Sequence, residues 1–480
     1  MPPFLALIIW FVCLVLLFRF DPAKEPKTSI ALWIPTLALS FIGSRNPTQW
    51  FVGQISISAQ SFEEGSPVDR LISLALILIA VVILTRRSFK WGEFFGRNIA
   101  LSVMIGFGLL SVVWSDFAFV AFKRWFRDVG TLLFILVVLS DPHPIGAVRT
   151  VLRRICYLLV PLSILLNKYF PDYSRSYSGW TGAVSLQGAT TSKNMLGVLC
   201  LVSALFFLWD SAGRWSKRKD RRTKRILLVN AAFLLMSLSL LADAHSTTST
   251  VCLVLGASVI ALGNSKTWQR HPGALKILLP ATFLIYLVMS FGFDMSGSLA
   301  QSVGKDPTLT DRTKIWSFVL GMHTNPIIGC GYQSFWLGPR LDFFWNNAGL
   351  GHLNEAHNGY LGLYLDEGFI GVGLLLVFLI SSYRLIYGRF KQKADIGVLG
   401  LATWICIVFY NMSEQSFEGG LFYLVFLMLG ISVPIFARKN LRATAISSDA
   451  EAYPEIAKDG AVLETMTVVH RYEQIAFSRS

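Results

Sequence analysis

The amino-acid sequence predicts an all-α polytopic integral membrane protein. Of its 480 residues, 53% are hydrophobic and only 15% are charged, whereas soluble domains carry about a quarter charged residues. The mean hydropathy is +0.54. The basic residues lie in short loops between long apolar runs, so the net charge of +14 follows the positive-inside rule. We therefore expect membrane lipid, and no nucleic acid, as a partner.

Thirteen apolar runs meet or approach the ~20 residues that cross a bilayer, and we expect 12–13 transmembrane helices because one run could be re-entrant. The first run lacks a basic segment and a small-residue cleavage site, so we interpret it as a retained span. The runs cover residues 4–18, 30–43, 71–84, 99–114, 129–139, 155–166, 195–209, 226–242, 251–262, 275–292, 361–380, 398–410 and 421–436.

Lysine and arginine cluster on alternate loops, and this alternation predicts the orientation. The most basic interval, residues 214–225, belongs inside the cell. We interpret its charge as the signal that keeps this loop inside, and the alternative is a regulatory role or binding to anionic lipid. The longest polar loop, before the third-last helix, has the opposite parity. We therefore expect it on the external face of the membrane, which is the periplasmic face if the cell has an outer membrane.

The chain divides on this basis into four parts. Residues 1–292 form an N-terminal transmembrane bundle, 293–357 the large periplasmic loop, 358–437 the C-terminal transmembrane helices, and 438–480 a polar cytoplasmic tail without apolar periodicity. The tail is expected to be mostly disordered. Five of the six cysteines lie within apolar runs, and no Cys or His spacing indicates a metal. No cofactor is expected.

Several motifs with defined spacing lie in and around the polar loop. The most specific is His357-Asn358, followed after nine residues by Gly-Phe-Ile-Gly at 368–371. Others are D-R-T-K-I-W at 311–316, N-P-I-I-G-C-G at 325–331, S-K-N-M-L-G at 192–197, and L-W-I-P at 32–35 with G-S-R at 43–45. Together these motifs resemble the O-antigen ligases and related bacterial polysaccharide polymerases over residues 30–435. The last pair is similar to the exopolysaccharide-polymerase branch.

The resemblance implies a metal-independent glycosyltransferase whose donor is an oligosaccharide on undecaprenyl diphosphate. A polymerase would join such repeat units into an exopolysaccharide or O-antigen chain, while an O-antigen ligase would transfer the chain to lipid A core or a protein. Ligases usually carry an arginine where this chain reads D-A-H-S-T-T at 243–248, which favours the polymerase. The basic loops and tail are compatible with a chain-length regulator and export machinery as partners.

The acceptor hydroxyl must lose its proton, and histidine is the usual base near neutral pH. His357 is therefore the first catalytic candidate, with Asn358 and Glu355 as supporting residues. The alternative is that His357 only caps the following helix. Glu367 is the rival base, because a carboxylate in an apolar helix is costly without a role, although it could instead pair with a cation.

The departing lipid diphosphate calls for cations fixed at the membrane surface. Arg312 is the first candidate, since arginine binds phosphate bidentately. Lys193 and Arg45, at the outer ends of two spans, are further candidates, although snorkelling side chains give the same pattern. Trp316 could support a sugar or merely anchor the loop at the interface.

A flippase or other transporter is the alternative from a different class. Transporters place charged or helix-breaking residues within paired spans near the midplane of the bilayer. Here the distinctive polar residues gather at the rim and in one unpaired loop, which favours an enzyme.

Overall fold

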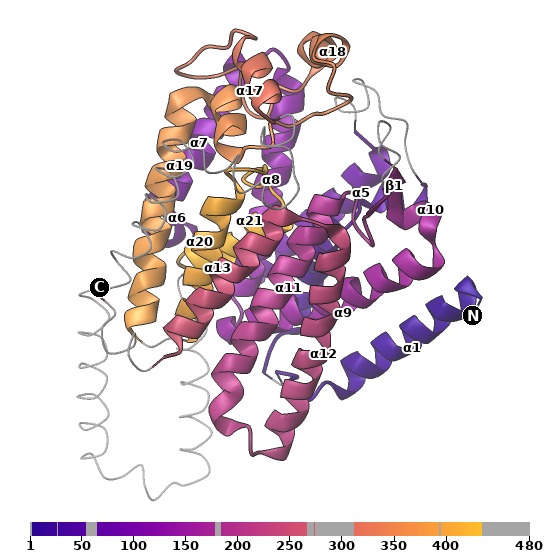
Figure 1. Cartoon of the computed structure of the whole chain (residues 1–480). Helices are drawn as coiled ribbons and strands as arrows, with labels where there is room; N and C mark the ends of the chain where they lie inside the picture. The colour runs from indigo at the N-terminus through magenta and orange to yellow at the C-terminus, as the bar shows by residue number, and fades with distance from the viewer. Residues whose placement is uncertain are drawn as a thin grey trace, which may run out of the picture.

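The structure, a computed structural model, describes residues 2–25, 27–53, 65–177, 184–265, 273, 312–392 and 395–433. Its regular structure is helical apart from one antiparallel pair of short strands, β1 (Arg175–Tyr177) and β2 (Val184–Leu186). Most helices form an upright bundle, and two short helices lie over its upper end (Figure 1). The predicted fold class is confirmed.

Six helices in these ranges are long and apolar enough to cross a membrane: α1 (Pro3–Phe20), α5 (Pro67–Arg86), α9 (Pro144–Tyr169), α11 (Lys193–Arg214), α12 (Arg221–Ala244) and α19 (Gly359–Lys391). A seventh would be the pair α6 (Trp91–Arg97) and α7 (Ile99–Ser111), which is bent by 100°. The bundle also contains α2 (Trp33–Ile42), α3 (Pro47–Phe51), α8 (Ala118–Leu139), α10 (Pro171–Ser174), α13 (Thr247–Gly263), α20 (Asp395–Tyr410) and α21 (Leu421–Gly430).

Twelve of the thirteen predicted spans coincide with helices, and the run at 275–292 lies outside the described residues. So do residues 293–311 and the tail 438–480. Many helices extend beyond the apolar runs; α9, for example, begins eleven residues before its run. Polar residues can continue a helix past the hydrocarbon, so hydropathy alone underestimates its length. The number of complete crossings stays a prediction.

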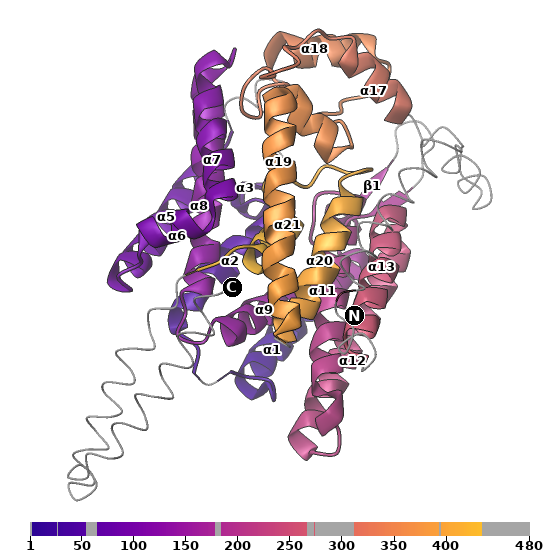
Figure 2. The same ribbon diagram turned by 90° about the vertical axis from the view of Figure 1, so that its left-hand side faces the viewer.

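The bundle has a buried centre and a lipid-exposed periphery. In the most apolar windows of α9 and α11, 72% of the residues are buried, against 6% for α1. Helix α11 packs against α12 and α13, and α13 packs against α20. Figure 2 shows α19 standing beside α20 and α21, with α7 and α8 on its other side. A second apolar cluster joins the two short helices at the upper end to the bundle.

The upper end of the bundle is covered by two helices where the sequence predicted only a loop. Helices α17 (Arg312–Leu320) and α18 (Gly338–Asn347) lie at the top of Figure 1. Their buried side chains Ile315 and Phe344 belong to the same apolar cluster as Leu365 of α19. The described part of the loop is therefore a folded unit that is anchored on α19.

Helix α19 is kinked at Gly368, whose φ of 65° lies in the left-handed region. A Cβ there would lie 2.3 Å from the carbonyl carbon of Ile327, so the position requires glycine. Two carbonyls of the turn at 325–331 accept hydrogen bonds from the backbone N–H groups of Phe369 and Ile370, at 2.9 and 3.1 Å. The turn thus satisfies donors that the kink frees, which would be costly in a membrane.

Candidate active site

The candidate site is built on the segment that enters α19. His357 has a φ of 49°, in the left-handed region that non-glycine residues seldom adopt. The next residue, Asn358, caps the helix, because its Oδ1 accepts hydrogen bonds from the backbone N–H groups of Tyr360 and Leu361 at 3.0 and 3.1 Å. The capping role considered for His357 is thus filled by Asn358, and the imidazole faces other partners.

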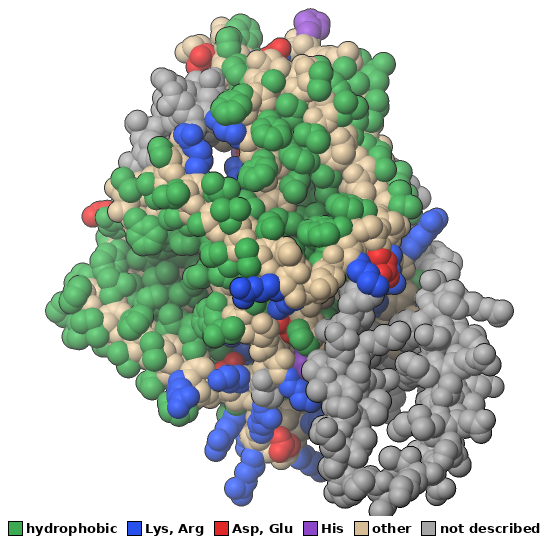
Figure 3. All heavy atoms as spheres, turned by 180° about the vertical axis from the view of Figure 1, so that it is seen from behind, with side chains coloured by type: hydrophobic (Ala, Val, Ile, Leu, Met, Phe, Trp, Pro, Cys, Tyr) green, Lys and Arg blue, Asp and Glu red, His purple; other side chains and the backbone are tan. Residues whose placement is uncertain are grey.

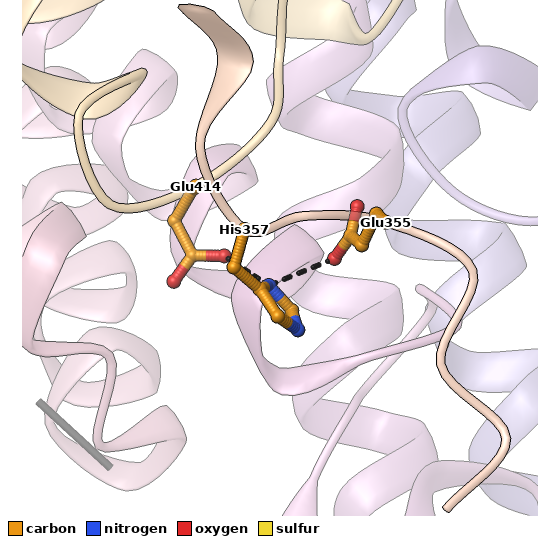
Figure 4. A group of neighbouring side chains, drawn as sticks. All are labelled: Glu355, His357 and Glu414. Carbon is orange, nitrogen blue, oxygen red and sulfur yellow. Dashed lines mark hydrogen bonds and ion pairs between the residues drawn. The ribbon is translucent and has the colours of Figure 1, made fainter. Parts of the chain in front are cut away.

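The imidazole of His357 lies between two carboxylates (Figure 4). Its Nδ1 is 3.0 Å from Oε1 of Glu355 and 3.3 Å from Oε2 of Glu414. Glu355 precedes it on the same segment, whereas Glu414 comes from the connection between α20 and α21. In Figure 4 the far ring nitrogen, Nε2, points away from both carboxylates. The carboxylates therefore orient the ring and leave Nε2 for a ligand.

These carboxylates also set the proton affinity of the imidazole. Burial acts to lower the pKa of His357, but the hydrogen bonds and charges of Glu355 and Glu414 together outweigh it and raise the pKa to about 9. The ring is therefore mostly protonated at neutral pH before substrate binds. When it loses that proton, it is a stronger base than an ordinary imidazole.

Helix α17 contributes two side chains one turn apart, on one face. An amino group of Arg312, Nη2, lies 2.6 Å from Oε1 of Glu414. The indole N–H of Trp316 donates to the carbonyl of Ala356 at 2.9 Å. The spacing of the R-x-x-x-W motif is thereby explained, since its arginine pairs with the carboxylate beside His357 and its tryptophan fixes the adjacent backbone.

The connection between α20 and α21 supplies partners that sequence reasoning missed. Glu414 also accepts a hydrogen bond from the side-chain amide of Asn194, at 2.8 Å. The neighbouring Gln415 accepts one from the backbone N–H of Ala356, at 3.2 Å. The sequence signal for both was slight: a carboxylate and an amide in a short polar interval between the last two spans. We name the four charged residues the rim cluster: Arg312, Glu355, His357 and Glu414.

The other two predicted diphosphate ligands have different surroundings. Lys193 begins α11, next to Asn194, and is exposed. Arg45 is buried, and its guanidinium donates to the backbone carbonyls of Thr190 (3.1 Å) and Tyr173. Lys193 thus precedes Asn194, which contacts Glu414 of the rim cluster, while Arg45 holds the segment before α11. A diphosphate-binding role for either residue stays a prediction.

Glu367, the rival base, lies apart from the rim cluster. It is 3% exposed and lines a cavity of about 100 Å³ at the kink of α19. Within the described ranges its Oε2 is buried without a hydrogen-bond partner. No member of the rim cluster lines this cavity. We name it the kink cavity, and its carboxylates are Asp128, Asp366, Glu367 and Glu418.

One donor atom from each of Glu355, His357 and Glu414 lies within 4.8 Å of the others, so these three residues could hold a metal ion. The same atoms are also well placed to share a proton at Nδ1. In addition, Arg312 already supplies a positive charge 2.6 Å from Glu414, and that charge would repel a cation. Metal-independent chemistry stays a prediction that a chelator tests.

Comparison with known proteins adds the family. Residues 231–376 match a protein-family model that is described as O-antigen ligase. This segment is similar to the O-antigen ligase family, and the match covers less than half of the chain. The predicted relation to the O-antigen ligase and polymerase superfamily is thereby confirmed, whereas the exopolysaccharide-polymerase branch stays a prediction. A comparison with curated proteins gave no match.

The matched segment contains three members of the rim cluster and also Glu367. Glu414 lies outside the matched residues, as do Lys193 and Arg45. The matched segment therefore supplies the histidine and the arginine, and the fold brings the second carboxylate to them from a later segment. The match supports a glycosyl-transferring membrane enzyme of the ligase or polymerase type.

Proposed function

We propose that the protein polymerises undecaprenyl-diphosphate-linked oligosaccharide repeat units into an exopolysaccharide or O-antigen chain, at the periplasmic face of the inner membrane. The observation that carries this proposal is the rim cluster. It places a histidine with an available Nε2 beside an arginine at one end of a membrane bundle. The match of residues 231–376 to the O-antigen ligase family model supports a glycosyl-transferring reaction.

Arg312 stabilises the leaving group in this proposal. Negative charge grows on the lipid diphosphate as its bond to the sugar breaks, and a fixed guanidinium stabilises that charge. Arg312 is 18% exposed and is paired with Glu414, so an incoming diphosphate competes with or shares this pair. Lys193, exposed at the start of α11, supplies a second positive charge.

His357 takes the proton. The acceptor hydroxyl attacks the anomeric carbon, the bond from that carbon to the diphosphate oxygen breaks, and the hydroxyl proton passes to Nε2 of neutral His357. Glu355 and Glu414 then stabilise the imidazolium through its Nδ1–H, as a carboxylate does in a catalytic triad. Direct displacement of this kind inverts the anomeric configuration.

The surface supports the proposed orientation. Hydrophobic side chains cover much of the face in Figure 3, and most of the lysines and arginines visible there lie toward its lower end. The helices α17 and α18 mark the upper end. Under the positive-inside rule the lower end faces the cytoplasm and the rim cluster faces the periplasm. A lipid-linked donor then reaches Arg312 sideways from the bilayer.

An O-antigen ligase would use the same chemistry on a different acceptor. The resemblance to ligases implies an arginine in the interval 243–248, where this chain has His245 at the end of α12. His245 is exposed and has no resolved ion pair in the described part of the chain. The missing permanent cation favours the polymerase.

The test is reconstitution of the purified protein in lipid with the undecaprenyl-diphosphate repeat unit, a chelator and no nucleotide sugar. A ladder of lipid-linked multimers is expected. It should be absent with His357→Ala and retained with His323→Ala, an exposed histidine of the same rim. A single transfer that needs lipid A core would indicate a ligase. Inertness with both acceptors would favour a transporter, and rescue by a divalent cation would contradict metal independence.

A further inference from the structure

We propose a second ligand site, which binds the phosphate headgroup of an anionic phospholipid at the end of the bundle opposite the rim cluster. A cavity of about 290 Å³ lies between α1, the start of α2 and the first half of α9. Helix α11 runs from Asn194, beside the rim cluster, to Arg214, which lies 3.8 Å from Glu25 of this cavity. A helix of that length separates the two sites by roughly 30 Å.

Three arginines of α9 line this cavity, which we name the headgroup cavity, and one of them has no ion pair in the described part of the chain. Arg149 and Arg153 both pair with Asp210, at 3.5 and 2.5 Å. Arg154 has no ion pair within the described ranges, and its Nη1 is buried without a hydrogen-bond partner. Its guanidinium lies over the indole ring of Trp33, 4.0 Å from the ring centroid. Arg154 is therefore a fixed cation with donors left for an anion.

The acids of the headgroup cavity do not serve Arg154. Asp21 accepts a hydrogen bond from the hydroxyl of Tyr157 at 3.2 Å, and Glu25 is drawn toward the arginine at the end of α11. Lys24, between these two acids in the sequence, is exposed and adds an ammonium group to the lining. Arg154 and Lys24 are thus two cations on one cavity, which suits a phosphate group.

The surroundings favour a lipid over a soluble anion. Ile30 and Trp33, which line the opening, are 84% and 36% exposed. Among the residues of α1 only Ala6 and Leu14 are buried, so the apolar surface beside the cavity lies open to acyl chains. Tryptophan is typical of the membrane interface, and basic pockets between helices on the cytoplasmic side bind anionic headgroups. Figure 1 shows α1 at the side of the bundle, where a lipid has access.

This site is independent of the proposed glycosyl transfer, and its test does not use activity. The full chain in detergent is titrated with palmitoyl-oleoyl phosphatidylglycerol, or with phosphatidylcholine of the same chains, and bound lipid is counted by native mass spectrometry. We expect about fivefold tighter retention of phosphatidylglycerol and a loss of about fivefold in Arg154→Gln. Arg86→Gln, an exposed arginine at the same end of the bundle, should change nothing.

Several results would overturn the proposal. Equal retention of the two lipids by the unaltered protein would do so without any variant, which protects the test if Arg154→Gln folds poorly. Arg154→Lys keeps the charge and should retain most of the preference. An equal loss in Arg86→Gln would reveal a general charge effect. Displacement of the lipid by inorganic phosphate alone would identify a soluble anion as the ligand.

Discussion

The rim cluster lies at the segment that enters α19, and the kink cavity lies at the kink of the same helix. The two groups of carboxylates differ in how their charges are paired. In the rim cluster, two carboxylates meet one arginine and one imidazole, with Glu414 in contact with both cations. In the kink cavity, Asp128 pairs with Arg127 at 3.1 Å, but Oε2 of Glu367 is buried without a hydrogen-bond partner in the described part of the chain. Paired charges near the surface can exchange partners with a substrate, whereas a buried carboxylate without a partner is more stable when it stays neutral.

This difference favours His357 over Glu367 as the proposed base. No residue of the rim cluster lines the kink cavity, so the two groups of carboxylates are separate in the fold. Substitutions that remove one charge at a time test this difference between the two groups.

The largest effect is expected for His357→Ala. Loss of the base should lower the rate of chain extension about 10³-fold, as general base catalysis typically contributes 10² to 10⁴. The rate is measured with the reconstituted protein, alongside the thermal midpoint in detergent. A variant that keeps its fold and extends chains at the normal rate would contradict the base assignment.

Arg312→Ala should lower the rate about 10²-fold, because one fixed donor to a developing oxyanion is worth that much or more. Arg312→Lys should recover only part of the rate, since an ammonium group cannot bind the diphosphate bidentately. Arg340 offers a matched control, because it pairs with Asp116 at the same rim and touches no member of the rim cluster. If Arg340→Ala lost as much activity as Arg312→Ala, a general effect of rim charge would explain both.

Glu355→Gln should shift the pH dependence of the reaction. A base must be neutral, so kcat/KM of the unaltered protein should rise with pH until about 9, the raised pKa of His357. Removing the Glu355 charge lowers that pKa toward its ordinary value, and the rise should occur at lower pH. A fall in kcat/KM between pH 7 and 9 would instead mean that the imidazolium form is required.

The same group makes stability depend on pH. The pKa of His357 is raised from 6.5 to about 9 by folding, so its contribution is fully present below pH 6.5 and is lost as the pH rises through about 9. The contribution is on the order of 2 kcal/mol, because the partly exposed Glu355 is screened by water. The thermal midpoint should therefore fall across this window, and His357→Gln should flatten that slope while His323→Gln should not.

The smallest effect is expected for Glu367→Gln. The amide fills the same space as the neutral carboxyl group, so we expect less than about a threefold change in rate, equivalent to ~0.6 kcal/mol. The thermal midpoint should be unchanged or higher. A loss of 100-fold with an intact fold would move the base assignment from His357 to Glu367.

Much of the site could be predicted from the sequence because its motifs are local. His357 and Asn358 were placed at the entry of an apolar helix, because that motif is local. Arg312 and Trp316 were placed only in a loop, and helix α17, which sets them one turn apart, was not predicted. Glu414 could not be found in this way, because it lies 57 residues after His357 and 102 after Arg312. Nothing in its own short loop indicates those contacts.

The sequence by itself determined the membrane class and the positions of twelve apolar helices, because hydropathy over ~20 residues is a local property. It also indicated the relation to the O-antigen ligase and polymerase superfamily, through motifs with a fixed spacing along the chain. Which charges meet follows from the folded structure alone. Glu414 contacts both cations of the rim cluster, Arg45 donates hydrogen bonds to backbone carbonyls, and Glu367 lines the kink cavity. Ion pairs between distant segments depend on how helices pack, and helix packing is not encoded in any single stretch of the chain.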